Sequence, residues 1–121
     1  MSTSPAPKSK TVSVVEVLST RIYKLYVPTS VRGIRSIAQH IKTLTGIAGG
    51  HTFTSSYGVW IGAEDQTVHE PVTCYEFVVT RNHEDFHAAI LNTLRGLLEC
   101  GEACGMCTMQ DDKNLSCITV S

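Results

Sequence analysis

The segment RIYKLYVPTSVRGIRSIAQHIKTLT (residues 21–45) decides the fold, because it joins a strand to an amphipathic helix across a proline. Its β-branched and aromatic residues alternate in side-chain direction, which predicts one long strand from Thr11 to Pro28, or two strands with a break at Ser19-Thr20. The hydroxyl-bearing residues after the proline can cap a helix that runs to Thr45. Apolar residues recur there at spacings of three and four, which gives the helix one buried stripe: Ile34, Ile37, Ile41 and Leu44.

The rest of the chain repeats this alternation of strands and helices. Gly46 and the Gly49-Gly50 pair predict the end of the first helix, and a strand follows at 51–61. Strand propensity resumes at Thr67, and further strands are expected at 72–79, 103–109 and 115–120, with Pro71 at the start or edge of its strand. Asn82 is placed to cap a second helix from 83 to 99. Its apolar stripe is Phe86, Ile90, Leu94 and Leu97.

This order predicts an α+β fold, namely a ferredoxin-like split βαβ arrangement (βαββαβ plus a terminal strand) with two helices on one face of an antiparallel sheet. A length of 121 residues suits one domain, which we place at 11–121, behind a disordered tail at 1–10. Each helix can bury only one stripe, so the other face of the sheet is exposed to solvent or is covered by another molecule. A second copy of the chain could cover it without any ligand or reaction, and we therefore expect a homo-oligomer.

Composition excludes several classes of function. The net charge of −1 lacks the cationic excess that general nucleic-acid binding requires. No apolar run approaches the roughly 18 residues of a membrane span, and the first ten residues lack the apolar centre of a signal peptide. We therefore expect a cytoplasmic protein with no membrane partner.

Five cysteines are an odd number in a reducing compartment, which favours buried thiols over disulfides. A metal-binding triple of Cys100, Cys104 and Cys107 is the alternative.

Four segments together resemble a family of small bacterial and phage proteins with a ferredoxin-like fold and unknown function. They are RIYKLYVP (21–28), GGHTFTSSYGVW (49–60), HEPV (69–72) and LRGLLECGEA (94–103). The positions that fit the G-x-T, G-x-W and E-P pattern of this family are Gly50, Thr52, Gly58, Trp60, Glu70 and Pro71. The cysteine-bearing segment 100–107 departs from the pattern. The resemblance implies the fold and supplies no activity.

The candidate binding site combines aromatic surface with a carboxylate on and beside two neighbouring strands. Its residues are Thr52, Tyr57, Trp60, His69 and Glu70. Such a set suits a polar partner or a small ligand. We therefore predict a non-catalytic binding protein without a cofactor, which acts through a host protein or a small polar or nucleotide ligand. Its resemblance to phage proteins adds the hypothesis of a phage-type inhibitor or sequestering protein.

A different hypothesis follows from HEDFH at residues 83–87, which is a literal HExxH motif. On a helix, His83 and His87 would lie one turn apart and could bind zinc, with Glu84 as the general base of a hydrolase. The motif begins in the first helical turn, and no third ligand follows at zincin spacing. The competing interpretation is that the acidic residues favour the helix N-terminus and the histidines pack beside the apolar stripe.

A third hypothesis is a PII-like nucleotide-sensing regulator, because such proteins share the split βαβ order and bind nucleotides between subunits. The sequence feature in favour is GGHT (49–52) at a helix-to-strand turn. No recognisable set of cations accompanies these glycines, so the support is architectural.

Overall fold

The computed structural model describes residues 19–102 and 104–121, and the predicted tail at 1–10 lies outside this range. The strands are β1 (Arg21–Pro28), β2 (Thr52–Ile61), β3 (Thr67–Val79), β4 (Gly105–Gln110) and β5 (Leu115–Val120). The helices are α1 (Thr29–Arg32), α2 (Arg35–Ala48) and α3 (His83–Glu99), with a short 3₁₀ turn, η1, at Ala63–Asp65. The strands form one antiparallel sheet in the order β2-β3-β1-β4-β5. This confirms the predicted α+β, ferredoxin-like fold with one added strand.

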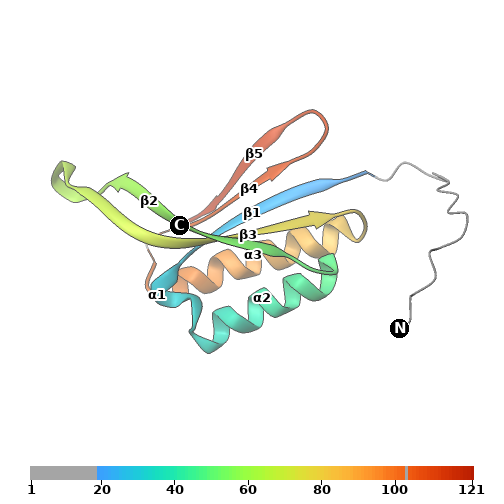
Figure 1. Cartoon of the computed structure of the whole chain (residues 1–121), viewed down its shortest axis with the longest axis horizontal. Coiled ribbons are helices and arrows are strands. Elements are labelled where there is room, and N and C mark those ends of the chain that lie inside the picture. The colour runs from blue at the N-terminus through green and yellow to red at the C-terminus, as the bar shows by residue number, and fades with distance from the viewer. Residues whose placement is uncertain (1–18, 103) are drawn as a thin grey trace, which may run out of the picture.

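The two long helices lie side by side on one face of the sheet (Figure 1). Between them and the sheet lies a continuous core, to which the central strand β1 contributes Tyr23, Leu25 and Val27. All four predicted stripe residues of α3 are buried. Within the described residues, no helix combines the length and the apolar character needed to cross a membrane.

The first predicted helix is in fact two helices. The chain leaves helical geometry at Ile34, whose φ of −66° and ψ of 131° are extended. This places the Ile34 side chain outside the stripe, where it is 40% exposed, while the other three stripe residues are buried. Gly46 does not stop α2, because a single helical glycine costs only about 1 kcal/mol. The helix ends instead at Gly49, whose φ of 91° is a left-handed cap.

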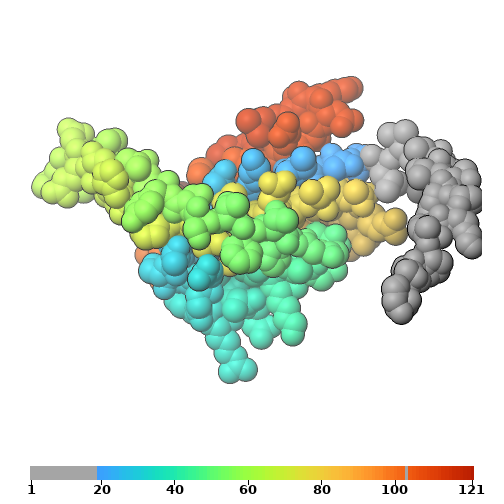
Figure 2. Space-filling model, viewed as in Figure 1, coloured from blue at the N-terminus to red at the C-terminus, as the bar shows by residue number. Residues whose placement is uncertain are grey.

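The β2–β3 hairpin extends beyond the body of the protein (Figures 1 and 2). Its outer part has only two strands, because β1 ends where Pro28 pairs with Val72. Pro71 lies inside β3 and not at its start, but at that position β3 pairs only with β2. A proline is tolerated there because one side of the strand has no neighbour to bond.

The face of the sheet opposite the helices, called the far face below, carries side chains that the core does not use. The pairing registers place Val78, Met106 and Leu115 on it, and they are 48%, 40% and 73% exposed. The helices therefore cover one face only, as predicted. The prediction of buried cysteines is wrong for most positions: among the five free cysteines, Cys107 is buried whereas Cys104 and Cys117 are exposed.

Candidate functional site

The register between β2 and β3 decides which predicted site residues meet. Gly58 is opposite Glu70, and Trp60 is opposite Val68, two residues along each strand. Side chains on alternate residues share a face, so Trp60 and Glu70 both lie on the far face. The structure therefore brings these two predicted residues together.

The other three predicted residues lie elsewhere. Tyr57 is opposite Pro71 and His69 is opposite Val59, which places both side chains on the helix side of the sheet. Thr52 is on the far face but pairs with Glu76. It is separated from Gly58 by six residues, or roughly 20 Å along the strand. Sequence proximity grouped these residues, whereas the two-residue period of a strand divides them.

Trp60 lies over Gly58. A methyl group added at Gly58 would meet Trp60 Cζ3 at 2.2 Å, so the ring occupies the space that a side chain would fill. Opposite residues in an antiparallel pair have Cα atoms about 4.5–5.5 Å apart, so this ring lies beside the side chain of Glu70. The glycine thus permits an aromatic ring and a carboxylate to be neighbours on an otherwise open surface.

A second carboxylate, that of Glu102, follows the end of α3 and interacts electrostatically with Glu70. Gly101 has φ of 96° and donates its N–H to the Leu98 carbonyl, while Glu102 donates its N–H to the Leu97 carbonyl at 3.2 Å. These two bonds form a Schellman motif, which fixes the position of Glu102 relative to the helix. Partial burial, and next the carboxylate of Glu70, raise the pKa of Glu102 above its ordinary value.

We call Gly58, Trp60, Glu70 and Glu102 the acidic–aromatic cluster. A helix C-terminus favours cations, so a carboxylate just after one is electrostatically unfavourable without a positive partner. Two neighbouring carboxylates repel each other for the same reason. A cationic ligand would relieve both, and the face of the indole ring adds a cation–π attraction. The cluster is therefore suited to a positively charged organic group.

The HExxH histidines are turned to different partners. His83 Nε2 is 3.1 Å from the Ser19 carbonyl oxygen, and His87 Nδ1 is 3.1 Å from the Tyr23 hydroxyl. Glu84 is exposed at the start of α3. In the described residues, no group of three or more His, Cys, Asp or Glu side chains is arranged to hold a metal ion. His87 thus contacts β1 and His83 contacts Ser19, and the described residues do not bring a third ligand to them for the zinc centre of the hydrolase hypothesis.

The GGHT segment also has a structural use. Gly49 donates its N–H to the Thr45 carbonyl at 2.8 Å and ends α2. This accounts for Gly49 as a helix cap without a phosphate ligand.

No family model matches the chain, and no curated protein matches it. Among solved structures it is similar to a phage SAM lyase, seen in an apo state and in complex with S-methyl-5'-thioadenosine. The apo structure has a TM-score of 0.59 and 19% identity, with 90% of this chain and 98% of that chain covered. The complex has a TM-score of 0.57 and 17% identity, with coverage of 89% and 97%. At this identity the likeness shows a shared fold.

This finding corrects the functional prediction. We expected a non-catalytic binding protein and no enzyme, whereas the solved structures that share this fold over about nine tenths of the chain are enzymes. The expectation relied on the uncovered face of the sheet and on a set of aromatic and acidic residues, and the two alternatives relied on HExxH and GGHT. His83, His87 and Gly49 of those motifs make structural contacts in this protein.

Sequence reasoning missed two members of the cluster. Gly58 was noted only as part of a resemblance, since nothing in one sequence tells which glycine lies beneath a ring. Glu102 did carry a signal, because an acidic residue directly after a helix-ending glycine is unfavourable unless something positive approaches it.

Proposed function

We propose that this chain is a lyase that acts on S-adenosylmethionine and releases S-methyl-5'-thioadenosine. The observation that carries the proposal is the acidic–aromatic cluster, on a chain that shares the fold of phage SAM lyase. S-adenosylmethionine is a cation with a sulfonium and an α-ammonium group. A site with two carboxylates and an exposed indole matches that charge.

The chemistry of this release sets what the protein has to supply. The bond between sulfur and Cγ of the methionyl chain breaks, and its electron pair goes to sulfur, which leaves as a neutral thioether. The Cγ atom replaces its lost bond to sulfur in one of two ways. The substrate's own carboxylate attacks it and forms homoserine lactone, or Cβ loses a proton to a base and vinylglycine forms. Both routes balance, and the second product distinguishes them.

The two carboxylates are assigned to the α-ammonium group of the substrate. The sulfonium loses its charge in the transition state, so a carboxylate held against it would stabilise the ground state more and slow the reaction. The ammonium keeps its charge throughout, and Glu70 and Glu102 can hold it without that penalty. In the elimination route, one of them would instead accept the Cβ proton. Trp60 would form an apolar wall beside the departing thioether.

We also propose that a second copy of the chain covers the hairpin. β2 is an edge strand of ten residues, TFTSSYGVWI, without a charge or a proline. Its helix-side row is largely exposed, with Phe53 at 57%, Tyr57 at 72%, Val59 at 57% and Ile61 at 65%. Long uncharged edges of this kind pair readily with another chain.

The test is incubation of the purified protein with S-adenosylmethionine, with products measured by liquid chromatography and mass spectrometry. We expect S-methyl-5'-thioadenosine to appear far above the spontaneous rate. Glu70→Gln should lower kcat/KM by roughly 10- to 100-fold, because a charge-assisted hydrogen bond is lost.

Glu76→Gln is the matched control for this variant. It removes a carboxylate from the same face of the same strand, six residues away, and should retain full activity. Release of S-methyl-5'-thioadenosine at no more than the spontaneous rate, from a protein with native circular dichroism, would refute the proposal.

A further inference from the structure

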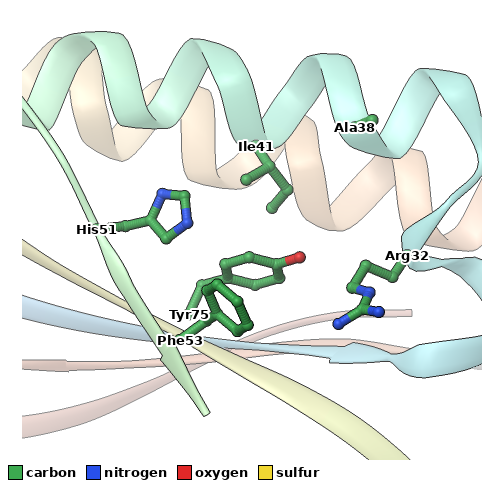
Figure 3. Close-up of a pocket in the computed structure, with 6 residues that line it drawn as sticks. All are labelled: Arg32, Ala38, Ile41, His51, Phe53 and Tyr75. Carbon is green, nitrogen blue, oxygen red and sulfur yellow. The ribbon is translucent and has the colours of Figure 1, made fainter. Parts of the chain in front are cut away.

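A hollow of about 390 Å³ lies on the helix side of the sheet, between α2 and the first residues of β2. Figure 3 shows it with its six lining residues: Arg32, Ala38, Ile41, His51, Phe53 and Tyr75. Gly58, Trp60 and Glu70 of the acidic–aromatic cluster lie on the far face, so the hollow belongs to a different site. Its volume is at the small end of the range for ligand pockets, about 300–1,000 Å³.

One end of the hollow is positive. Arg32 donates to Thr73 Oγ1 at 3.3 Å, and Thr73 is fully buried, so this bond ties the guanidinium to the sheet. Among the described residues no carboxylate pairs with Arg32, which leaves its remaining N–H groups for a ligand. The Tyr75 hydroxyl points toward the same end (Figure 3). Burial raises the pKa of Tyr75, with a smaller opposite effect from Arg32, so the phenol stays protonated and can donate.

The opposite end of the hollow presents an acceptor. Thr45 Oγ1 donates to the Ile41 carbonyl at 2.7 Å, and its oxygen is 2.8 Å from His51 Nδ1. The hydroxyl proton is committed to the carbonyl, so Nδ1 must carry the hydrogen in the bond to Thr45. The other ring nitrogen, Nε2, is then a bare acceptor in the neutral imidazole. Figure 3 shows this nitrogen turned toward the hollow.

The middle of the hollow is aromatic and apolar. His51 and Tyr75 meet edge to face with ring centroids 5.2 Å apart, and Phe53 lies 6.0 Å from Tyr75. Ile41 closes the side toward α2 (Figure 3). Such a surface accepts a planar ring by offset or edge contacts.

From these three features, we propose that the hollow binds a small aromatic carboxylate whose ring carries a hydrogen-bond donor at the end away from the acid group. The carboxylate accepts from Arg32 and Tyr75, the ring lies against Phe53, and the donor meets His51 Nε2. This inference is independent of the proposed lyase activity, because the two sites lie on opposite faces of the sheet.

The test uses 4-hydroxyphenylacetate as the probe, with binding followed by isothermal titration calorimetry and by nuclear magnetic resonance of the His51 ring. A ligand of this size should bind with a Kd of roughly 1 mM. The uncharged amide, 4-hydroxyphenylacetamide, should bind at least about tenfold more weakly, because it loses charge-assisted bonds. Phenylacetate lacks the donor and should be about two- to tenfold weaker.

Two variants locate the binding. Arg32→Gln should weaken binding of the probe about tenfold or more, whereas Arg35→Gln, which removes an exposed cation of α2 that does not line the hollow, should not. His51→Phe should abolish the preference for 4-hydroxyphenylacetate over phenylacetate. The inference is overturned by any of three results: no saturable binding up to about 20 mM, twenty times the expected Kd; equal affinity for acid and amide; or equal weakening by Arg32→Gln and Arg35→Gln in proteins of native circular dichroism.

Discussion

Replacing Gly58 by alanine is the sharpest test of the acidic–aromatic cluster. The added Cβ would lie 2.2 Å from Trp60 Cζ3. Carbon atoms in contact prefer about 3.5 Å or more, so the ring has to move by at least about 1.3 Å, the difference between the two distances. Both residues lie on the outer hairpin, away from the core, so the protein should keep its fold and lose the placement of the ring beside Glu70.

The effect on activity follows from that displacement. A misplacement of about 1 Å in a group that positions a substrate can lower the rate on the order of 100-fold. We therefore expect kcat/KM for release of S-methyl-5'-thioadenosine to fall by roughly two orders of magnitude in Gly58→Ala. Trp60 is the single tryptophan of the chain, so its fluorescence reports the ring movement directly. The emission maximum and quenching by iodide should both change.

Gly46→Ala is the matched control, because a methyl group at this helical glycine meets nothing within 4 Å. It should leave activity and fluorescence unchanged and stabilise the protein by about 1 kcal/mol. The reasoning fails if Gly58→Ala retains wild-type activity while its fluorescence shows that the ring has moved. It also fails if the ring has not moved at all.

Four further outcomes are expected. Because the pKa of Glu102 is above its ordinary 4.5 in the folded protein, the folded state keeps this proton longer, and stability falls as the pH rises through that window. Glu102→Gln should therefore melt above the wild type at pH 7 but not at pH 4. Burial raises the pKa of Cys107 to about 12, so at pH 8 a thiol reagent should label Cys104 quickly and Cys107 only after unfolding, as read by mass spectrometry. Leu94→Ala should cost about 2–5 kcal/mol in urea denaturation, because the side chain is fully buried, and a loss below about 1 kcal/mol would contradict this packing. Val59→Lys should reduce the mass measured by light scattering, since a charge on the edge strand blocks pairing with a second copy.

Most of the fold can be predicted from the sequence, because the two-residue period of the strands and the 3.6-residue period of the helices are both clear. The bounds of α3 and β5 agree with the prediction, and the α3 stripe is buried as expected. The break before α2 was not readable, since Gly33 and Ile34 fit a helical pattern as well as a turn. Asn82 occupies the cap position but makes no capping bond with its side chain, so tertiary packing and not the cap decides where α3 begins.

Only part of the candidate site can be predicted from the sequence. Trp60 and Glu70 were selected because aromatic and acidic side chains occur close together, and the structure brings these two onto one face. Tyr57 and His69 fit the same rule. Each is separated from Trp60 or Glu70 on its own strand by an odd number of residues, so its side chain lies on the opposite face. Glu102 is separated from Glu70 by 32 residues in sequence, and it reaches the cluster only through the turn that ends α3. Contacts of this kind depend on tertiary geometry that one sequence does not encode locally.

The proposed lyase activity requires no catalytic motif with a fixed spacing, because of the chemistry of the proposed substrate. A sulfonium is already an activated leaving group, and the carboxylate of the same molecule can serve as the nucleophile. The protein then has to hold a flexible cation in a reactive conformation and keep water away, which requires positioning groups more than a nucleophile or a base. Such groups have no fixed spacing in sequence. On this view Glu70 and Glu102 act through the charge of the substrate, and the second product, lactone or vinylglycine, decides whether either of them also moves a proton.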